Sequence, residues 1–301
     1  MQPVPTNQAA RSGARVAGDG DVVRGESHPA CDTVPAATWS TGAAPHDRPF
    51  TDQLVRVLGE AAMQQLGVFP LPPGFVLSVV MPIYNERRTI REIVDRVRAV
   101  PIPKEIIIVD DCSRDGTREI LKEMEQDADL KICYHDRNQG KGAALRSGFR
   151  HATGDVIVIQ DADLEYDPRE YPRLIQSIVD GRADVVYGSR FRGDLVRVHL
   201  FWHRVANYLL TTLSNATTNL NLSDMETCYK AFRHSAIDGM QLSQQRFGFE
   251  PEITAKFARR KLRIFEVPIS YAGRDYSEGK KIGALDALHA VYCILRYAVA
   301  D

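Results

Sequence analysis

The sequence lacks the features that mark disulfide-rich and nucleic-acid-binding proteins. Its 301 residues include five cysteines, an odd number, and no two of them have the C-x-x-C spacing of metal and redox sites. A basic excess is also missing, because 38 Lys and Arg face 39 Asp and Glu for a formal charge of -1. These absences exclude a disulfide scaffold and count against a nucleic-acid partner. We expect reduced, mostly buried thiols.

Long apolar runs are missing as well. The longest candidate for a membrane span, 282–300, contains Asp286, His289 and Arg296 and falls short of about twenty apolar residues. The first thirty residues lack the apolar core of a secretory signal. We therefore expect a cytoplasmic protein without a transmembrane helix. Any membrane contact would be peripheral, on the cytoplasmic face.

Three segments differ in composition. Residues 1–50 hold six prolines and no periodic apolar run, which predicts a disordered N-terminal extension. Residues 51–75 predict a short amphipathic helix over 54–66 followed by a proline-rich linker. Residues 76–301 predict one globular domain, in a chain that is 44% hydrophobic overall.

Apolar runs and amphipathic stretches alternate from residue 77 onward. The runs predict strands at 77–81, 105–109, 130–134, 155–160 and 184–187. Helical periodicity predicts helices at 89–100, 117–124, 142–151 and 168–180, the first opened by a capping box of Thr89 and Glu92. This alternation predicts an α/β fold with a mostly parallel, Rossmann-like sheet flanked by helices.

Three predicted strands end in polar clusters, at 82–86, 110–116 and 161–165. Ligands of open α/β sheets bind at the carboxyl ends of the strands, so we expect the site there. The third cluster places Asp161, Asp163 and Glu165 at alternating positions. Carboxylate oxygens with diphosphate completing the shell suit Mg²⁺ or Mn²⁺, which predicts a metal at this cluster.

A glycine-rich stretch, 138–142, opens the third helix and offers backbone N–H groups to phosphate. It does not fit the P-loop pattern, because Gly142 follows Lys141 where Ser or Thr is required. It does not fit the dinucleotide fingerprint either, because Leu145 stands where the third glycine belongs.

Together and in this order, these motifs resemble glycosyltransferase family 2, in particular its dolichyl- and polyprenyl-phosphate sugar synthases. The similarity spans roughly 77–297. The matching stretches are VVMPIYNE (79–86), IIIVDDCSRDGT (106–117), NQGKGAALRSG (138–148), IQDADLEYDP (159–168), VVYGSR (185–190), DMETCYKAF (224–232), FGFEPEITAK (247–256) and RDYSEGKKI (274–282).

The resemblance implies a GT-A fold and an inverting enzyme that moves a hexose from a GDP- or UDP-hexose to a polyprenyl phosphate with a divalent metal. The implied nucleotide-sugar site comprises Pro82, Tyr84, Glu86, Asp110, Asp111, Lys141, Ala162 and Arg190. Within it, Asp111 is expected to recognise the base edge. The implied metal ligands are Asp161, Asp163 and Glu165. The implied catalytic residues are Asp161, Asp163, Arg190 and Arg274. The residues implied to bind the acceptor phosphate are Arg204, Arg274 and Lys280.

Several alternatives stay open at this stage. A family 2 enzyme that glycosylates a soluble hydroxyl needs a general base, whereas a phosphate acceptor does not. A sugar-nucleotide nucleotidyltransferase is disfavoured because the first strand leads into 82–86 instead of a glycine-rich basic loop. A non-catalytic binding module is disfavoured because a carboxylate is present at every expected metal position.

Three further features allow two interpretations each. Glu250 and Glu252 either contact the sugar or cap a helix. The apolar stretch 200–213 is either core or a membrane-facing surface, and the basic run 256–263 is either a solvated face or a site for anionic lipid.

Overall fold

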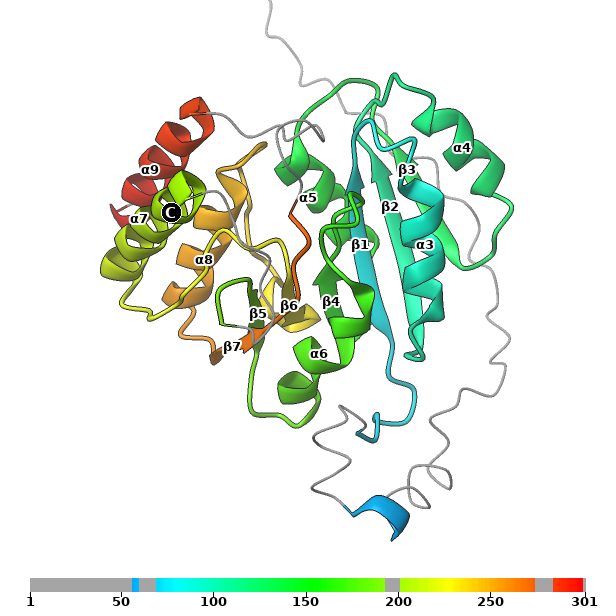
Figure 1. Ribbon diagram of the computed structural model, residues 1–301, viewed down its shortest axis with the longest axis horizontal. Helices are drawn as coiled ribbons and strands as arrows, with labels where there is room; N and C mark the ends of the chain where they lie inside the picture. Colours follow the sequence, from blue (N-terminus) through cyan, green and yellow to red (C-terminus); the bar gives the residue numbers. More distant parts are fainter. Residues whose placement is uncertain (1–55, 60–68, 193–200, 274–283, 300–301) are drawn as a thin grey trace, which may run out of the picture. The chain divides into compact units, whose positions relative to one another are not determined.

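The computed structural model describes residues 56–59, 69–192, 201–273 and 284–299 (Figure 1). All of them lie in the larger of two units into which the chain divides, Val34–Asp301. The predicted disordered extension 1–50 lies outside the described residues. So does most of the predicted helix 54–66, of which 56–58 are described and helical. Residues 69–76 form the expected linker of turn and irregular structure.

One mixed sheet of seven strands forms the centre of the described chain. The five predicted strands are present as β1 (Leu77–Ile83), β2 (Lys104–Asp110), β3 (Leu130–Tyr134), β4 (Val156–Ile159) and β5 (Val185–Ser189). Two strands that the sequence did not predict, β6 (Lys230–Arg233) and β7 (Ile264–Pro268), complete the order β3-β2-β1-β4-β6-β5-β7. The sheet is mostly parallel as expected, and β6 is the antiparallel strand between β4 and β5.

The helices follow the predicted alternation. The four predicted ones appear as α3 (Ile90–Ala99), α4 (Thr117–Met124), α5 (Lys141–His151) and α6 (Tyr171–Val179), the last preceded by the 3-10 turn η1 (Pro168–Glu170). The turn η2 (His234–Ala236) follows β6. The remaining helices are α7 (Phe201–Thr218), α8 (Phe249–Arg259) and α9 (Ala284–Val299).

The capping box predicted for α3 is wrong. Thr89 stands at the N-cap with φ -115° and ψ -21°, a nearly helical backbone, and makes no side-chain cap. Its hydroxyl instead donates to the Glu86 carboxylate at 3.0 Å. Glu92 pairs with Arg96 one turn later. A nearly helical N-cap directs its hydroxyl away from the free amides that a cap must reach.

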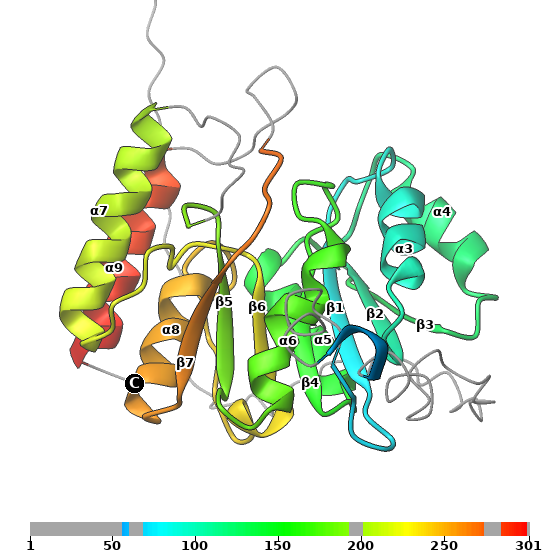
Figure 2. The ribbon, with the colours of Figure 1, turned by 60° about the horizontal axis from the view of Figure 1, so that its bottom comes forward.

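Helices cover both faces of the sheet (Figure 2). Phe232 of β6 contacts Phe149 of α5 and Phe257 of α8, with ring centroids 5.6 and 5.5 Å apart, so α5 and α8 share one face. On the other face, Tyr171 of α6 and Tyr229 both donate to the Gln160 side-chain oxygen at 2.7 Å. Helices α7 and α9 pack on each other and on α8, at the edge away from β3.

Two composition-based expectations can be checked directly. No disulfide joins the four described cysteines, and Cys133, Cys228 and Cys293 are buried. No helix among the described residues combines the length and apolar character needed to cross a bilayer.

Candidate active site

The loops after β1 and β2 are joined by hydrogen bonds. The Asn85 amide donates to the Ser113 hydroxyl at 2.9 Å, and the Asn85 side-chain oxygen accepts from the Arg114 amide at 2.8 Å. Asn85 has a φ of 56°, which asparagine tolerates better than most residues. The Glu86 amide donates to the Thr117 hydroxyl at 2.9 Å. These contacts fix the two loops side by side at the carboxyl edge of the sheet.

The predicted nucleoside residues lie on this frame. Pro82 pairs with Val109 in the β1–β2 register, and Tyr84 follows with 38% of its surface exposed. Asp110, which ends β2, is fully buried and accepts from the Ser113 amide at 3.1 Å and from Arg118 Nε at 2.7 Å. Asp110 therefore stabilises the loop after β2 from its buried side. Nucleoside binding by these residues stays a prediction.

Asp111 holds the glycine-rich loop. Its carboxylate accepts from His135 Nδ1 at 2.7 Å, from the Gln139 amide at 2.9 Å and from the Gly140 amide at 2.6 Å. Burial acts to raise the pKa of Asp111, but these hydrogen bonds outweigh it and lower that pKa below its usual value. His135 Nε2 in turn lies 2.9 Å from the Ser147 hydroxyl of α5. Recognition of a base edge by Asp111 remains a prediction.

The start of α5 differs from the expected phosphate loop. The Ala143 amide donates to the Gln245 carbonyl at 3.3 Å, and those of Gln139 and Gly140 bind Asp111. A Cβ added at Gly140 would lie 2.4 Å from the Gln245 carbonyl oxygen. The glycines of this stretch thus allow the backbone of 244–245 to lie directly on the helix start, so these three amides are already occupied within the protein.

The acidic cluster after β4 lies where the sequence predicts it, with Ala162 buried between its two aspartates. Lys141 Nζ is 3.1 Å from Asp161 Oδ1. Glu165 accepts a hydrogen bond from the Tyr271 hydroxyl, and the Glu165 amide donates to Asp163 at 3.2 Å. No group of three or more His, Cys, Asp or Glu side chains in the described part of the chain is arranged to hold a metal. Glu165 thus binds Tyr271 in this structure, and metal binding by Asp161, Asp163 and Glu165 stays a prediction.

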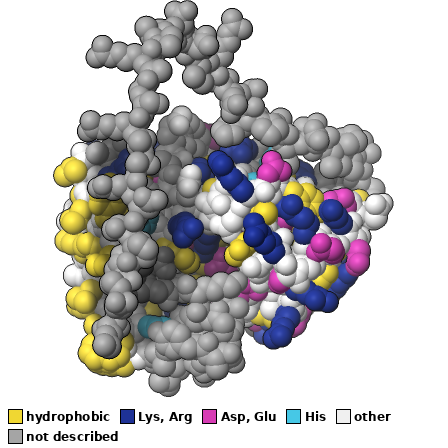
Figure 3. Space-filling model, turned by 90° about the horizontal axis from the view of Figure 1, so that it is seen from above, with side chains coloured by type: hydrophobic (Ala, Val, Ile, Leu, Met, Phe, Trp, Pro, Cys, Tyr) yellow, Lys and Arg dark blue, Asp and Glu magenta, His cyan; other side chains and the backbone are white. Residues whose placement is uncertain are grey.

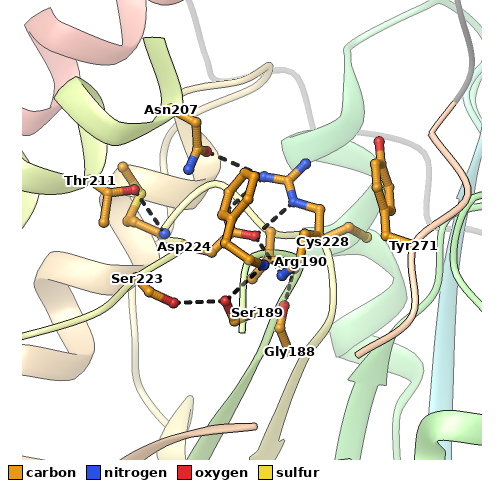
Figure 4. Close-up of polar contacts among 12 residues, drawn as sticks. Gly188, Ser189, Arg190, Asn207, Thr211, Ser223, Asp224, Cys228 and Tyr271 are labelled. Atoms are coloured by element: carbon orange, nitrogen blue, oxygen red, sulfur yellow. Dashed lines mark hydrogen bonds and ion pairs between the residues drawn. The ribbon is translucent and has the colours of Figure 1, made fainter. Parts of the chain in front are cut away.

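Arg190, at the end of β5, is held in place by an ion pair (Figure 4). Asp224 accepts from its Nε and Nη2, both at 2.7 Å, and Asn207 of α7 accepts from Nη2 at 3.3 Å. The guanidinium carbon also lies over the rings of Tyr271 and Phe191, at 5.3 and 5.6 Å. Burial acts to lower the pKa of Arg190, but the Asp224 carboxylate outweighs it, and the pKa is raised well above its usual value.

Arg204 of α7 approaches the same ring. Its guanidinium carbon lies 5.6 Å from the centroid of Phe191, the distance that also separates Arg190 from that ring. The structure therefore brings together two of the predicted phosphate-binding arginines. The other two predicted residues, Arg274 and Lys280, lie outside the described residues.

The two glutamates of α8 have different surroundings. Glu252 is fully buried and accepts from the amides of Ser243 and Gln244, each at 2.8 Å, so it orders the loop that covers α5. Glu250 faces the acidic cluster instead, with Oε1 3.4 Å from Lys141 Nζ. Neither glutamate caps α8, whose N-cap is Gly248.

Two residues close to the site had no role assigned from sequence. Asp224 positions Arg190, and Glu226 lies near Glu250 with burial and that carboxylate raising the pKa of Glu226 to about 8. Both belong to the stretch 224–232, where two acidic residues interrupt a sequence that is otherwise mostly buried. That mixture of acidic and buried positions is the sequence feature from which a role for Asp224 and Glu226 in the site could have been predicted.

The basic run 256–263 is mostly engaged within the protein. Lys256 is buried and lies 3.2 Å from Glu252. Arg263 binds Asp184. The Arg259 and Arg260 side chains donate to the carbonyls of Tyr297 and Ala236. Arg259, Arg260 and Arg263 are nevertheless exposed, which fits the interpretation of a solvated face, whereas Lys256 belongs to the interior. Binding of anionic lipid by this run stays a prediction.

An apolar surface lies beside the two arginines. Four side chains of α7 and four of α9 are exposed on it, with Trp202 at 75% and Val299 at 86%. They are Phe201, Trp202, Tyr208, Leu209, Leu288, Tyr292, Leu295 and Val299. We call this the α7–α9 surface; hydrophobic side chains line that flank when the carboxyl edge is viewed from above (Figure 3). The stretch 200–213 is therefore not plain core.

Comparison with known proteins identifies the family to which this sequence is similar. Residues 78–240 match the family model described as glycosyl transferase family 2. An undecaprenyl-phosphate 4-deoxy-4-formamido-L-arabinose transferase of Edwardsiella ictaluri is 34% identical over 222 residues, which cover 72% of this chain and 66% of the relative. The protein of that name from Salmonella paratyphi A is 33% identical over 219 residues, covering 71% and 64%. The chain thus spans just under two thirds of the length of these relatives.

The fold is also shared with solved structures. Glucosyl-3-phosphoglycerate synthase from Mycobacterium tuberculosis, in complex with Mn²⁺, uridine diphosphate and phosphoglyceric acid, has a TM-score of 0.60 at 18% identity, over 76% of this chain and 80% of that one. Its complex with Mn²⁺, uridine-diphosphate-glucose and phosphoglyceric acid gives 0.59 at 18% identity, over 76% and 81%. The predicted GT-A fold is confirmed, and Mn²⁺ accompanies a nucleotide in structures of this fold.

Proposed function

The chain belongs to glycosyl transferase family 2, and on that basis we propose that it transfers a hexose from a GDP- or UDP-hexose to a polyprenyl phosphate with inversion. The observation that carries the proposal is the position of Arg190 and Arg204. They flank Phe191 where α7 begins, and α7 also carries half of the α7–α9 surface. Cationic groups beside exposed apolar side chains suit an acceptor with a phosphate head and a hydrocarbon tail.

The donor site is proposed at the edge formed by β1, β2 and β4. Tyr84 and the frame of 85–117 would receive the nucleoside, and Lys141 the diphosphate. An Mg²⁺ or Mn²⁺ ion fits beside them, because Asp161 and Asp163 offer the hard oxygen ligands that such ions take together with diphosphate. Once bound, the metal would neutralise charge on the departing nucleoside diphosphate.

The transfer requires no general base if the acceptor is a phosphate. A phosphate monoester has a second pKa of about 6, so its oxygen is already an anionic nucleophile at neutral pH. What the protein must supply is positive charge at fixed positions, because two anionic substrates have to approach each other. Asp224 fixes the Arg190 guanidinium through two hydrogen bonds of 2.7 Å, which prepares it for this task.

The lipid acceptor also implies contact with a membrane surface. The α7–α9 surface is suited to it, because aromatic and aliphatic side chains lie together and neither α7 nor the segment 287–299 contains Asp or Glu. We therefore place the protein at the cytoplasmic membrane surface as part of the same proposal.

A matched acceptor assay tests the proposal. Release of nucleoside diphosphate is measured for a panel of GDP- and UDP-hexoses with Mn²⁺, with either undecaprenyl phosphate in detergent or soluble saccharides as acceptor. Turnover should depend on the polyprenyl phosphate, and Arg204→Ala should lower it at least tenfold. Arg91→Ala, an exposed arginine on α3, serves as control and should have no effect. Turnover with saccharides only would make the chain a hydroxyl-directed family 2 enzyme.

A further inference from the structure

Two enclosed carboxylate oxygens beside the proposed donor site have no hydrogen-bond partner in the part of the chain that the structure describes. Glu250 is 4% exposed, and its Oε2 atom has no hydrogen-bond partner among the described residues. The same holds for Oε1 of Glu226, in the loop before β6. Buried polar atoms are nearly always paired in folded proteins, so two unpaired oxygens in one place indicate a group that is supplied by a ligand.

These oxygens lie next to the proposed diphosphate position. Lys141 Nζ is 3.4 Å from Glu250 Oε1 and 3.1 Å from Asp161 Oδ1, so a single ammonium group links Glu250 to the acidic cluster. The side chains of Lys141 and Asp161 are 21% and 22% exposed. A ligand that contacts Lys141 or Asp161 is therefore separated from Glu250 by no more than the side chain of Lys141.

The nearby Lys230 attracts Glu226 and Glu250 electrostatically, but its hydrogen bonds go elsewhere. Its ammonium donates to the carbonyls of Met225 and Thr227 and lies 4.9 Å from the centre of the Tyr187 ring. Glu252, two residues from Glu250 on the same helix, gives the contrast, because Ser243 and Gln244 satisfy both of its oxygens. The unpaired oxygens are thus a property of Glu226 and Glu250 and not of buried glutamates here in general.

The chemistry of the pair selects the ligand. The Glu250 carboxylate repels phosphate, and both side chains are too polar for an apolar group. Glu250 accepts hydrogen bonds from hydroxyl groups, and Glu226, which keeps its proton below a pKa of about 8, can donate one as well as accept. We propose that Glu226 and Glu250 form the subsite that binds hydroxyl groups of the transferred hexose and so determines which sugar is accepted. The inference rests on the proposed function, because the hexose lies next to the diphosphate in any nucleotide-sugar donor.

Binding measurements without turnover test this subsite. Isothermal titration calorimetry with Mn²⁺ compares UDP, GDP, UDP-glucose, UDP-galactose and GDP-mannose on the wild type, Glu250→Ala, Glu250→Gln and Glu226→Gln. The control is Glu119→Gln, an exposed glutamate of α4. Circular dichroism and thermal unfolding check that each variant is folded, and Glu250→Gln keeps the size of the side chain if Glu250→Ala is unstable.

The ratio of the two dissociation constants decides the result. In Glu250→Ala the Kd of the preferred nucleotide sugar should rise about tenfold or more, while the Kd of its nucleoside diphosphate stays within about twofold. The preference between UDP-glucose and UDP-galactose, or for GDP-mannose, should shrink accordingly. Equal changes in both constants, or unchanged binding of the nucleotide sugar in Glu250→Ala, would overturn the inference.

The proposed function fails in a different way. A wild-type chain that binds none of the five nucleotides removes the donor class, and the subsite falls with it. A chain that binds a nucleotide sugar through Glu250 but transfers nothing to undecaprenyl phosphate contradicts only the proposed acceptor.

Discussion

The carboxylate of Asp224 binds the guanidinium of Arg190 through both oxygens, each 2.7 Å from its nitrogen partner. Asp224 also accepts from the Arg190 amide at 3.1 Å and is itself fully buried. Side chain and backbone of the arginine are therefore fixed by one residue. The guanidinium cannot turn without breaking this contact, so its orientation toward the edge occupied by Tyr271 is set before any substrate arrives (Figure 4).

Asp224→Asn should therefore lower both stability and activity. Losing one partner of an enclosed ion pair leaves the other charge uncompensated, and we expect the free energy of unfolding to fall by about 3 kcal/mol. Turnover should fall at least tenfold, because Arg190 is no longer held for the acceptor phosphate. Urea unfolding and steady-state assays provide the two measurements.

Arg190→Lys is the companion variant for this prediction. It keeps the positive charge but loses the planar fork that matches Asp224. Its activity should be as low as that of Asp224→Asn. Wild-type turnover in either variant would show that the ion pair is only structural.

Most of the fold could be predicted because the parallel strands carry strong local patterns. Strand β2 has Ile106, Ile107, Ile108 and Val109 in one buried run, and α3 has a clear apolar face. Strand β6 escaped prediction because it has only four residues, and the first, Lys230, is charged yet fully buried. The carbonyls that satisfy Lys230 come from its own preceding loop, which a periodicity argument does not consider.

The site was less predictable than the fold, because its key contacts join distant segments. The sequence placed carboxylates at the strand ends, and the structure gathers them there. That Glu252 orders the loop over α5 while Glu250 faces Lys141 depends on which side of α8 each residue lies. The stretch around Gly140 and Gly142 fits no phosphate-loop pattern, although its backbone amides could have served phosphate, and the described role of these glycines is to admit the backbone of 244–245.

Gly140→Ala should be much more destabilising than Gly181→Ala. Both glycines have positive φ, 91° and 73°, and Gly140 also has ψ 164°, a backbone region that is essentially open to glycine alone. A Cβ at Gly140 would lie 2.4 Å from the Gln245 carbonyl oxygen, whereas one at Gly181 meets nothing within 4 Å. We expect the free energy of unfolding of Gly140→Ala to be lower than that of Gly181→Ala by about 2 kcal/mol. Equal losses in urea titrations would contradict the close approach of the two loops.

Replacement of Glu226 should change how stability depends on pH. Burial and the Glu250 carboxylate raise the pKa of Glu226 from 4.5 to about 8, so between these values the native state binds more protons than the unfolded state. This contribution to stability is complete below the unfolded pKa and is lost as pH rises through the folded pKa. The slope is at most about 1.4 kcal/mol per pH unit.

Glu226→Gln does not titrate, so its stability relative to the wild type should increase steadily from about pH 5 to pH 8. Denaturant unfolding at several pH values measures the difference. Glu119→Gln, which replaces an exposed glutamate, should differ from the wild type by a constant amount. A constant difference for Glu226→Gln would mean that its carboxyl group titrates normally.

Removal of the metal should abolish transfer. Asp161 and Asp163 are the proposed ligands, so excess chelator and Asp163→Ala should each reduce turnover below detection, and added Mn²⁺ should restore only the chelated wild type. Asp163 is partly exposed, so its replacement should leave the unfolding transition in place. Asp238→Ala, an exposed carboxylate away from this cluster, is the control. Full activity in chelator would rule out the proposed metal.

The α7–α9 surface should bind anionic vesicles, and its tryptophan can report on this directly. The sequence holds only two tryptophans, Trp39 and Trp202, so Trp39→Phe leaves Trp202 as a single fluorescent probe. On adding phosphatidylglycerol vesicles its emission should shift to shorter wavelength, because the indole, 75% exposed in the protein, enters the interface.

Leu209→Asp should weaken binding at least tenfold in sedimentation, since it places a charge in the apolar contact. Val57→Asp, at a side chain that is 80% exposed outside this surface, should sediment like the wild type. Emission that does not change at low salt, together with equal sedimentation of all variants, would mean that the lipid acceptor is reached without this surface.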